Sequence, residues 1–99
     1  MKIFKYTLSL GAPTFMTFPD PTKMLMFQIQ RGVPTIWCEI EENSAAPTCN
    51  LEYRVLATGD EIPVGMIHLG SAISGDFVWH LYYRVVSTQL NEDELLKPN

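Results

Sequence analysis

The sequence predicts an all-β domain, a small antiparallel β-sandwich or partly open barrel of six or seven short strands. Apolar residues recur at every second position in several runs, which is the repeat of a strand with one buried face. Glycines and prolines interrupt these runs at short, regular intervals. Strands joined mostly by tight turns leave no room for the helical crossovers of a parallel βαβ fold, which we therefore exclude.

Four strands are predicted in the first half of the chain, at 4–10, 14–18, 23–30 and 35–40. Gly11 ends the first strand, and the prolines at 19 and 21 end the second because proline cannot donate to a sheet ladder. The dipeptide Arg31-Gly32 predicts a tight hairpin between the third and fourth strands. The residues expected to face the core are Leu25, Phe27 and Ile29 in the third strand and Ile36, Cys38 and Ile40 in the fourth.

Three further strands are predicted in the second half, at 50–57, 65–70 and 75–86. A polar surface loop is expected at 42–48, and a loop of small residues at 71–76. The inward residues of the strand at 50–57 are predicted to be Leu51, Tyr53, Val55 and Ala57. The acidic segment 91–97 either forms one helical turn or frays.

The last strand has the strongest β pattern in the chain. Its inward face is predicted to carry Phe77, Trp79, Leu81, Tyr83 and Val85, and its other face Val78, His80, Tyr82, Arg84 and Val86. The second face mixes aromatic and polar groups, so it is either a second packing surface or a binding surface.

Length and composition indicate one domain, residues 1–90, followed by an acidic tail at 91–99. The chain has 99 residues, a net charge of −4 and only 18% charged residues. No basic cluster is present, which disfavours broad nucleic-acid binding, although a few placed arginines or amides suffice for a small anion. The runs 25–29 and 77–86 would be aggregation-prone as bare edges, so we expect them to be central or paired in a homo-oligomer.

The N-terminal segment lacks the features of a secretory signal, and no segment is apolar over the length that crosses a bilayer. We therefore expect no membrane association and a cytoplasmic location, where Cys38 and Cys49 stay reduced. Cys38 is expected in the core. A disulfide between the two across a hairpin is the less favoured alternative.

The sequence contains no catalytic or cofactor signature. His68 and His80 lack partners at zinc-ligand spacing, and no nucleophile-elbow motif occurs. We therefore expect no metal, no cofactor and no enzymatic activity. The row formed by His80, Tyr82 and Arg84 could meet an anionic or planar ligand, because arginine supplies a fork and tyrosine a stacking surface. The candidate binding residues are Trp37, Trp79, His80, Tyr82 and Arg84. The alternative is a solvated or interface face.

Four segments together resemble a widespread family of small uncharacterised bacteriophage and prophage proteins. They are Lys5-Tyr6, the stretch from Gln28 to Trp37, Ala57-Thr58-Gly59 and the stretch from Gly75 to Tyr82. The chain departs from that pattern at Cys38-Glu39 and in the loop from Ser44 to Asn50. The resemblance implies a phage accessory protein acting in the cytoplasm of a host bacterium, and it implies no particular activity.

Two functions follow as hypotheses. The first is a non-enzymatic effector that inhibits a host defence component or sequesters its small signalling molecule, with a host protein or a small anionic, nucleotide-like ligand as partner. The second is a structural or assembly module of the phage particle or its replication machinery.

Overall fold

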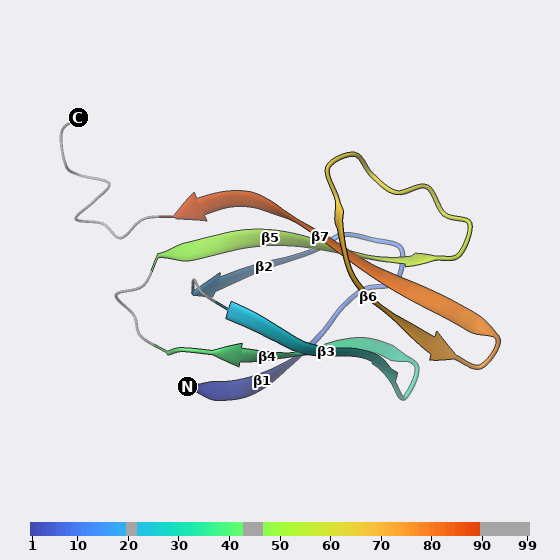
Figure 1. The fold of residues 1–99 in the computed structure, drawn as a ribbon, viewed down its shortest axis with the longest axis horizontal. Helices are drawn as coiled ribbons and strands as arrows, with labels where there is room; N and C mark the ends of the chain where they lie inside the picture. Colours follow the sequence, from blue (N-terminus) through green and yellow to red (C-terminus); the bar gives the residue numbers. More distant parts are fainter. Residues whose placement is uncertain (20–21, 43–46, 90–99) are drawn as a thin grey trace.

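The structure is a computed structural model that describes residues 1–19, 22–42 and 47–89, and in these residues the chain forms seven strands in two sheets. The strands are β1 (Lys2–Thr7), β2 (Thr14–Pro19), β3 (Thr22–Gln30), β4 (Val33–Ile40), β5 (Thr48–Ala57), β6 (Ile67–Ser74) and β7 (Phe77–Gln89). One sheet has the order β1-β4-β3 and the other β2-β5-β7-β6, with antiparallel pairing throughout. Figure 1 shows β1, β3 and β4 grouped on one side of the molecule and β2, β5 and β7 on the other. The predicted all-β sandwich is confirmed.

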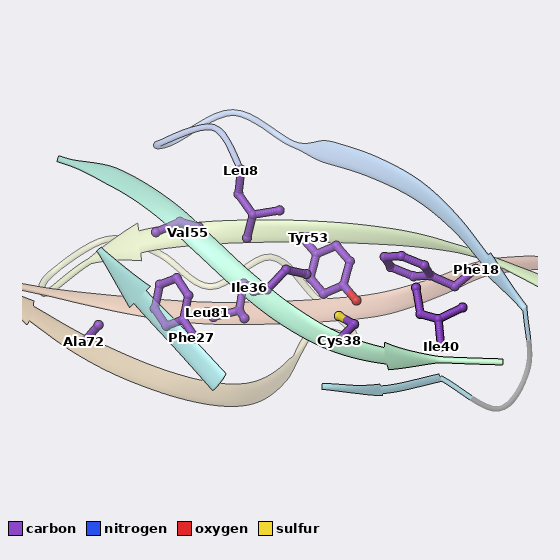
Figure 2. Close-up of a cluster of buried hydrophobic side chains, with 10 residues drawn as sticks. All are labelled: Leu8, Phe18, Phe27, Ile36, Cys38, Ile40, Tyr53, Val55, Ala72 and Leu81. Carbon is purple, nitrogen blue, oxygen red and sulfur yellow. The ribbon is translucent and has the colours of Figure 1, made fainter. Parts of the chain in front are cut away.

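The core lies between the two sheets, where the alternating side chains of both inner faces meet (Figure 2). Ile36 and Cys38 of β4, Val55 of β5 and Leu81 of β7 are 0% exposed. The predicted inward faces of β4 and β5 are therefore confirmed at these positions. Such a core follows from the two-residue repeat of a strand, which sends every second side chain to the same face.

The first predicted strand ends earlier than expected, because the chain leaves its sheet after Thr7. The Leu8 amide donates to the Pro34 carbonyl oxygen at 2.9 Å, and the Gly11 amide donates to the Val55 carbonyl oxygen at 3.1 Å. Leu10 forms an isolated bridge with Val55. Residues 8–11 thus cross from the first sheet to the second, and Leu8 is buried between them.

A β-bulge overturns the prediction for Leu25. Met24 pairs with Cys38 whereas Met26 pairs with Trp37, so one extra residue lies between these positions in β3. An extra residue moves the side chains on one side of the bulge to the opposite face. Leu25 is consequently 42% exposed, and Met24 packs against the core in its place.

The predicted loop at 71–76 is also wrong, since β6 continues to Ser74 and only Gly75-Asp76 forms the turn. The small side chains at 71–74 misled the prediction. In the structure Ala72 lies opposite Trp79, so a small residue accommodates a large one across the strand pair. Gly75 has a φ of 58°, a conformation that glycine adopts without strain.

Strand β7 lies between β5 and β6, as expected for so apolar a run, and extends past the core at both ends. Phe77 and Val85 are accordingly 63% and 54% exposed, although they share the inward face with Leu81. β3, in contrast, is an edge strand of its sheet. Its pairing with another copy of the chain stays a prediction.

Both cysteines are free thiols, Cys38 buried and Cys49 half-buried. Burial raises the pKa of the Cys38 thiol, which keeps it protonated. Positions 43–46 of the predicted surface loop and the whole C-terminal segment 91–97 lie outside the described residues.

Alkaline pH is expected to destabilise the fold through Tyr53, whose side chain is 4% exposed. Burial above all raises the pKa of its phenol, and the neighbouring Cys38 thiol adds to the shift. The unfolded chain then loses this proton near its ordinary pKa of about 10 while the folded chain keeps it, so stability falls as pH rises above that value. Urea denaturation at pH 8 and pH 11 should show a smaller loss for Tyr53→Phe than for the wild type. An equal loss in both would contradict this assignment.

Candidate functional site

The alternation of β7 divides the predicted binding residues instead of gathering them. His80, Tyr82 and Arg84 lie on the outer face of the four-stranded sheet. Trp79 lies on the opposite face, where it packs against the core and stacks on Phe77 with 6.1 Å between ring centroids. Trp37 belongs to β4 of the other sheet, on its outer face beside Lys5 in the register. Three of the predicted residues therefore share a surface.

A chain of four polar side chains crosses this outer face from β5 to β6. The Thr58 hydroxyl lies 3.0 Å from His80 Nε2, and the Ser71 hydroxyl lies 2.8 Å from His80 Nδ1. Ser71 Oγ also lies 3.0 Å from His68 Nε2. A hydroxyl has one proton and a neutral imidazole has one donor, so all the bonds must run in the same direction along the chain. Reversing one bond would reverse the others.

Tyr82 extends this chain into an aromatic surface. Its ring meets the His68 ring edge to face, with centroids 5.2 Å apart. The register places Tyr82 opposite His68 on β6 and opposite Arg54 on β5, so it occupies the middle of the outer face. The bulge between His68 and Gly70 sets this alignment.

The segment that joins β5 to β6, residues 58–66, forms a loop beside this face (Figure 1). Its start is closed by Asp60, whose amide donates to the Ala57 carbonyl oxygen at 3.1 Å and whose carboxylate accepts from the Ala57 amide at 2.9 Å. Its far end is tied to β7, since Arg84 Nη1 donates to the Val64 carbonyl oxygen at 3.2 Å. The loop is thus fixed to the sheet at two points.

Between this loop and the sheet lies a hollow of about 200 Å³, the loop pocket. Its lining consists of Leu56, Ala57, Thr58, Gly59, Asp60, Ile62, His80 and Tyr82. Leu56 and Ile62 provide apolar walls and Tyr82 an aromatic one, while Thr58, Asp60 and His80 provide hydrogen-bonding groups. A few polar groups in a mostly apolar hollow are typical of small-molecule sites.

The guanidinium of Arg84, a predicted binding residue, is held by Glu52. Arg84 Nη2 lies 2.8 Å from Glu52 Oε1, and Arg54 Nε donates to Glu52 Oε2 at 2.9 Å. Glu52 is only 3% exposed. The Arg54 hydrogen bond above all lowers the pKa of the Glu52 carboxyl; burial opposes this effect and Arg84 reinforces it. Arg84 thus links Glu52 to the loop, and its part in binding stays a prediction.

Sequence reasoning missed Glu52, Thr58, Asp60 and Ser71. Glu52 lies between two apolar residues of a strand, Leu51 and Tyr53. The reason why its carboxylate can be buried is seen only in the register, which places Arg84 opposite it. The sequence predicts that Thr58 and Asp60 end the strand in a turn, and in the structure they do so while also lining the pocket. The small side chains at 71–76 predict a loop for Ser71. The one available signal was the opposite charges of Glu52 and Arg54, two positions apart and therefore on the same face of a strand.

Among residues 1–19, 22–42 and 47–89, no three histidine, cysteine or acidic side chains gather in a way that could hold a metal ion. Within the same ranges the chain has no helix that could span a membrane.

Comparison with known proteins adds a family and no activity. Neither the curated proteins nor the solved structures searched gave a match to the chain. One family model, described as a domain of unknown function (DUF7352), matches residues 1–92, which includes both sheets and the loop pocket. A match over nearly the whole length shows that the chain belongs to this DUF7352 family.

Proposed function

We propose that this protein is a non-catalytic binding module that holds a small planar heterocycle in the loop pocket. This proposal rests on the composition of the pocket wall. The wall combines an aromatic ring and two apolar side chains with three hydrogen-bonding groups: Tyr82, Leu56 and Ile62 with Thr58, Asp60 and His80. Flat rings gain from aromatic and apolar walls, and their edges need hydrogen-bond partners. At about 200 Å³ the pocket suits one ring system, such as the base of a nucleoside.

The charged groups in and near the pocket narrow the class of ligand further. The guanidinium of Arg84 is paired with the Glu52 carboxylate and bonded to the Val64 carbonyl oxygen, and Arg84 is not part of the pocket lining. The ionisable carboxylate on the pocket wall is Asp60. A neutral ring with N–H donors on its edge therefore fits this pocket better than the anionic group expected from the sequence.

The imidazoles beside Ser71 raise the question of catalysis. A serine nucleophile needs a base that a third group orients, usually a carboxylate. Within the described part of the chain, neither His68 nor His80 is bonded to a carboxylate; His80 is held by Thr58 and Ser71. This arrangement supports a binding role for the two imidazoles.

The cellular setting belongs to the same proposal. The resemblance to bacteriophage and prophage proteins supports an accessory protein in the host bacterial cytoplasm that sequesters a signalling molecule of host defence or inhibits a defence protein. The proposal includes self-association of the protein through the edge strand β3, which exposes Leu25 and Met26. Light scattering on the purified protein measures this directly. A role in particle assembly is the competing function, and abundance of the protein in purified phage particles would favour it.

Tyr82→Ala is expected to weaken the binding of the preferred nucleoside at least about fivefold, because one stacked ring contributes roughly 1–3 kcal/mol. The experiment titrates the four common ribonucleosides into ¹⁵N-labelled protein and follows the amide signals of Thr58, Gly59 and Asp60. Phe15→Ala is the matched control, since Phe15 is an aromatic residue 64% exposed on β2, outside the pocket.

The proposal predicts that the ribonucleoside is recovered chemically unchanged after incubation. Absence of shifts with all four ribonucleosides would contradict the ligand class. Conversion of any of them by the purified protein would contradict the non-catalytic role.

A further inference from the structure

A second hollow, of about 300 Å³, lies on the three-stranded sheet, at the end of the β3–β4 hairpin. Its lining consists of Lys5, Thr7, Gln30, Arg31, Val33 and Thr35, and we call it the cationic hollow. The register places Thr7 opposite Thr35 and Gln30 opposite Val33, so three neighbouring strands contribute to one surface. It belongs to the other sheet from the loop pocket and shares no residue with it.

The two cations of this hollow have no acidic partner among the residues that the structure describes. Lys2 pairs with Glu42, and both Arg54 and Arg84 pair with Glu52. Lys5 and Arg31, in contrast, form no ion pair with any carboxylate of the described residues. In a chain of net charge −4, two uncompensated cations on one small surface create a local positive potential.

The hydrogen bonds within the hollow leave donors available. Lys5 Nζ donates to Gln30 Oε1 at 3.3 Å, which occupies the amide oxygen of Gln30 and leaves its two N–H groups. The Thr35 hydroxyl donates to the Val33 carbonyl oxygen at 2.9 Å and is therefore engaged. The remaining donors come from Lys5, Thr7, Gln30 and Arg31. A site of donors on positive groups matches an oxyanion.

The backbone of Arg31 supplies an independent observation. Arg31 has a φ of 51° and Gly32 a φ of 79°, which is the two-residue turn with both central residues in the left-handed region. Asparagine and glycine are the residues that this turn favours, and an arginine there is strained. Proteins retain strained backbone conformations mainly at residues with a function. For Arg31 we assign this function to its guanidinium, which lies at the rim of the hollow.

We infer that the cationic hollow binds the phosphate group of a small phosphorylated molecule. Arg31 supplies a planar fork for two phosphate oxygens, Lys5 a point charge and the Gln30 amide a neutral donor. Trp37 lies beside Lys5 in the register, on the same outer face, and its half-buried indole offers an apolar plane to the organic part of the molecule. This site gives Trp37 a role that the loop pocket does not.

The test is calorimetric titration of inorganic pyrophosphate at low ionic strength. Saturable binding is expected in the wild type, with at least tenfold lower affinity in Lys5→Gln and in Arg31→Asn. Lys23→Gln is the matched control: it makes the same change in net charge at an exposed lysine outside the hollow, and its affinity should stay within twofold of the wild type.

Arg31→Asn separates a ligand role from a structural one. Asparagine relieves the strained turn, so the urea midpoint of this variant should equal or exceed that of the wild type while pyrophosphate affinity falls. Equal weakening by Arg31→Asn and Lys23→Gln would overturn the site in favour of a diffuse charge effect, as would absence of binding. Tighter binding of a single-stranded oligonucleotide than of pyrophosphate would overturn the small-molecule assignment. Tyr82→Ala should leave pyrophosphate binding unchanged, so the two sites can fail separately.

Discussion

Leu81→Ala is expected to lower the free energy of unfolding by about 2–5 kcal/mol, the range for deleting a buried leucine side chain. Leu81 is 0% exposed in β7, the strand that pairs with both β5 and β6, and its side chain lies among the core residues of both sheets (Figure 2). The variant loses the transfer energy of three carbon atoms and leaves a cavity that a rigid sandwich fills poorly. Against a total stability of about 5–15 kcal/mol, such a loss is large. Urea denaturation followed by tryptophan fluorescence measures it.

Phe77→Ala is the matched control for this prediction. Phe77 lies on the same strand and the same face as Leu81, but it is 63% exposed beyond the end of the core. Its truncation should therefore destabilise the protein by less than about 1 kcal/mol, although more atoms are removed. A Phe77→Ala loss equal to that of Leu81→Ala would mean that the core extends to the end of the hairpin.

Glu52→Gln is expected to destabilise the fold by about 2–3 kcal/mol at pH 7. The substitution preserves shape but removes the charge that holds Arg54 and Arg84, both of which then face a neutral amide. Breaking a buried pair at one partner typically costs about 3–5 kcal/mol, and the partial exposure of the arginines reduces this figure. Glu42→Gln is the control, because the Lys2–Glu42 pair is exposed on both sides and should contribute less than about 1 kcal/mol.

Acidic pH is expected to destabilise the fold through Glu52. The arginines hold the pKa of Glu52 below its ordinary value of 4.5, so in mild acid the unfolded chain binds this proton before the folded chain does. The stability that Glu52 contributes is present above about pH 4.5 and is lost as pH falls through the lower pKa of the folded state. Denaturation at pH 7 and pH 3 should show a smaller decrease for Glu52→Gln than for the wild type. Parallel decreases would assign the acid sensitivity to other carboxylates.

The two-residue repeat was sufficient to predict the fold class and much of the core. Ile36, Cys38 and Val55 are buried where alternation placed them. The repeat failed where the register shifts, as at the bulge beside Leu25, because a bulge depends on the neighbouring strand and leaves no mark in the local pattern. It also failed at 71–74, since small residues belong to strands when the opposite position holds a bulky partner, as Trp79 does opposite Ala72.

The candidate site was harder to predict because its parts come from separate segments. Alternation alone placed His80, Tyr82 and Arg84 on one face and Trp79 on the other. Only the register shows that Arg84 meets Glu52, and only the path of residues 58–66 creates the loop pocket. Trp37 looked like a member of the same site because the sequence does not reveal which strands share a sheet.

The position of β7 has a consequence for folding during translation. β5 and β6 each pair with β7 in the four-stranded sheet, so neither has its full set of backbone partners until the ribosome has released residues 77–89. The β3–β4 hairpin can close earlier, since its strands are neighbours in the chain. A nascent chain therefore leaves one edge of β5 without a backbone partner while β7 is synthesised, and this interval is when a chaperone would be of most use.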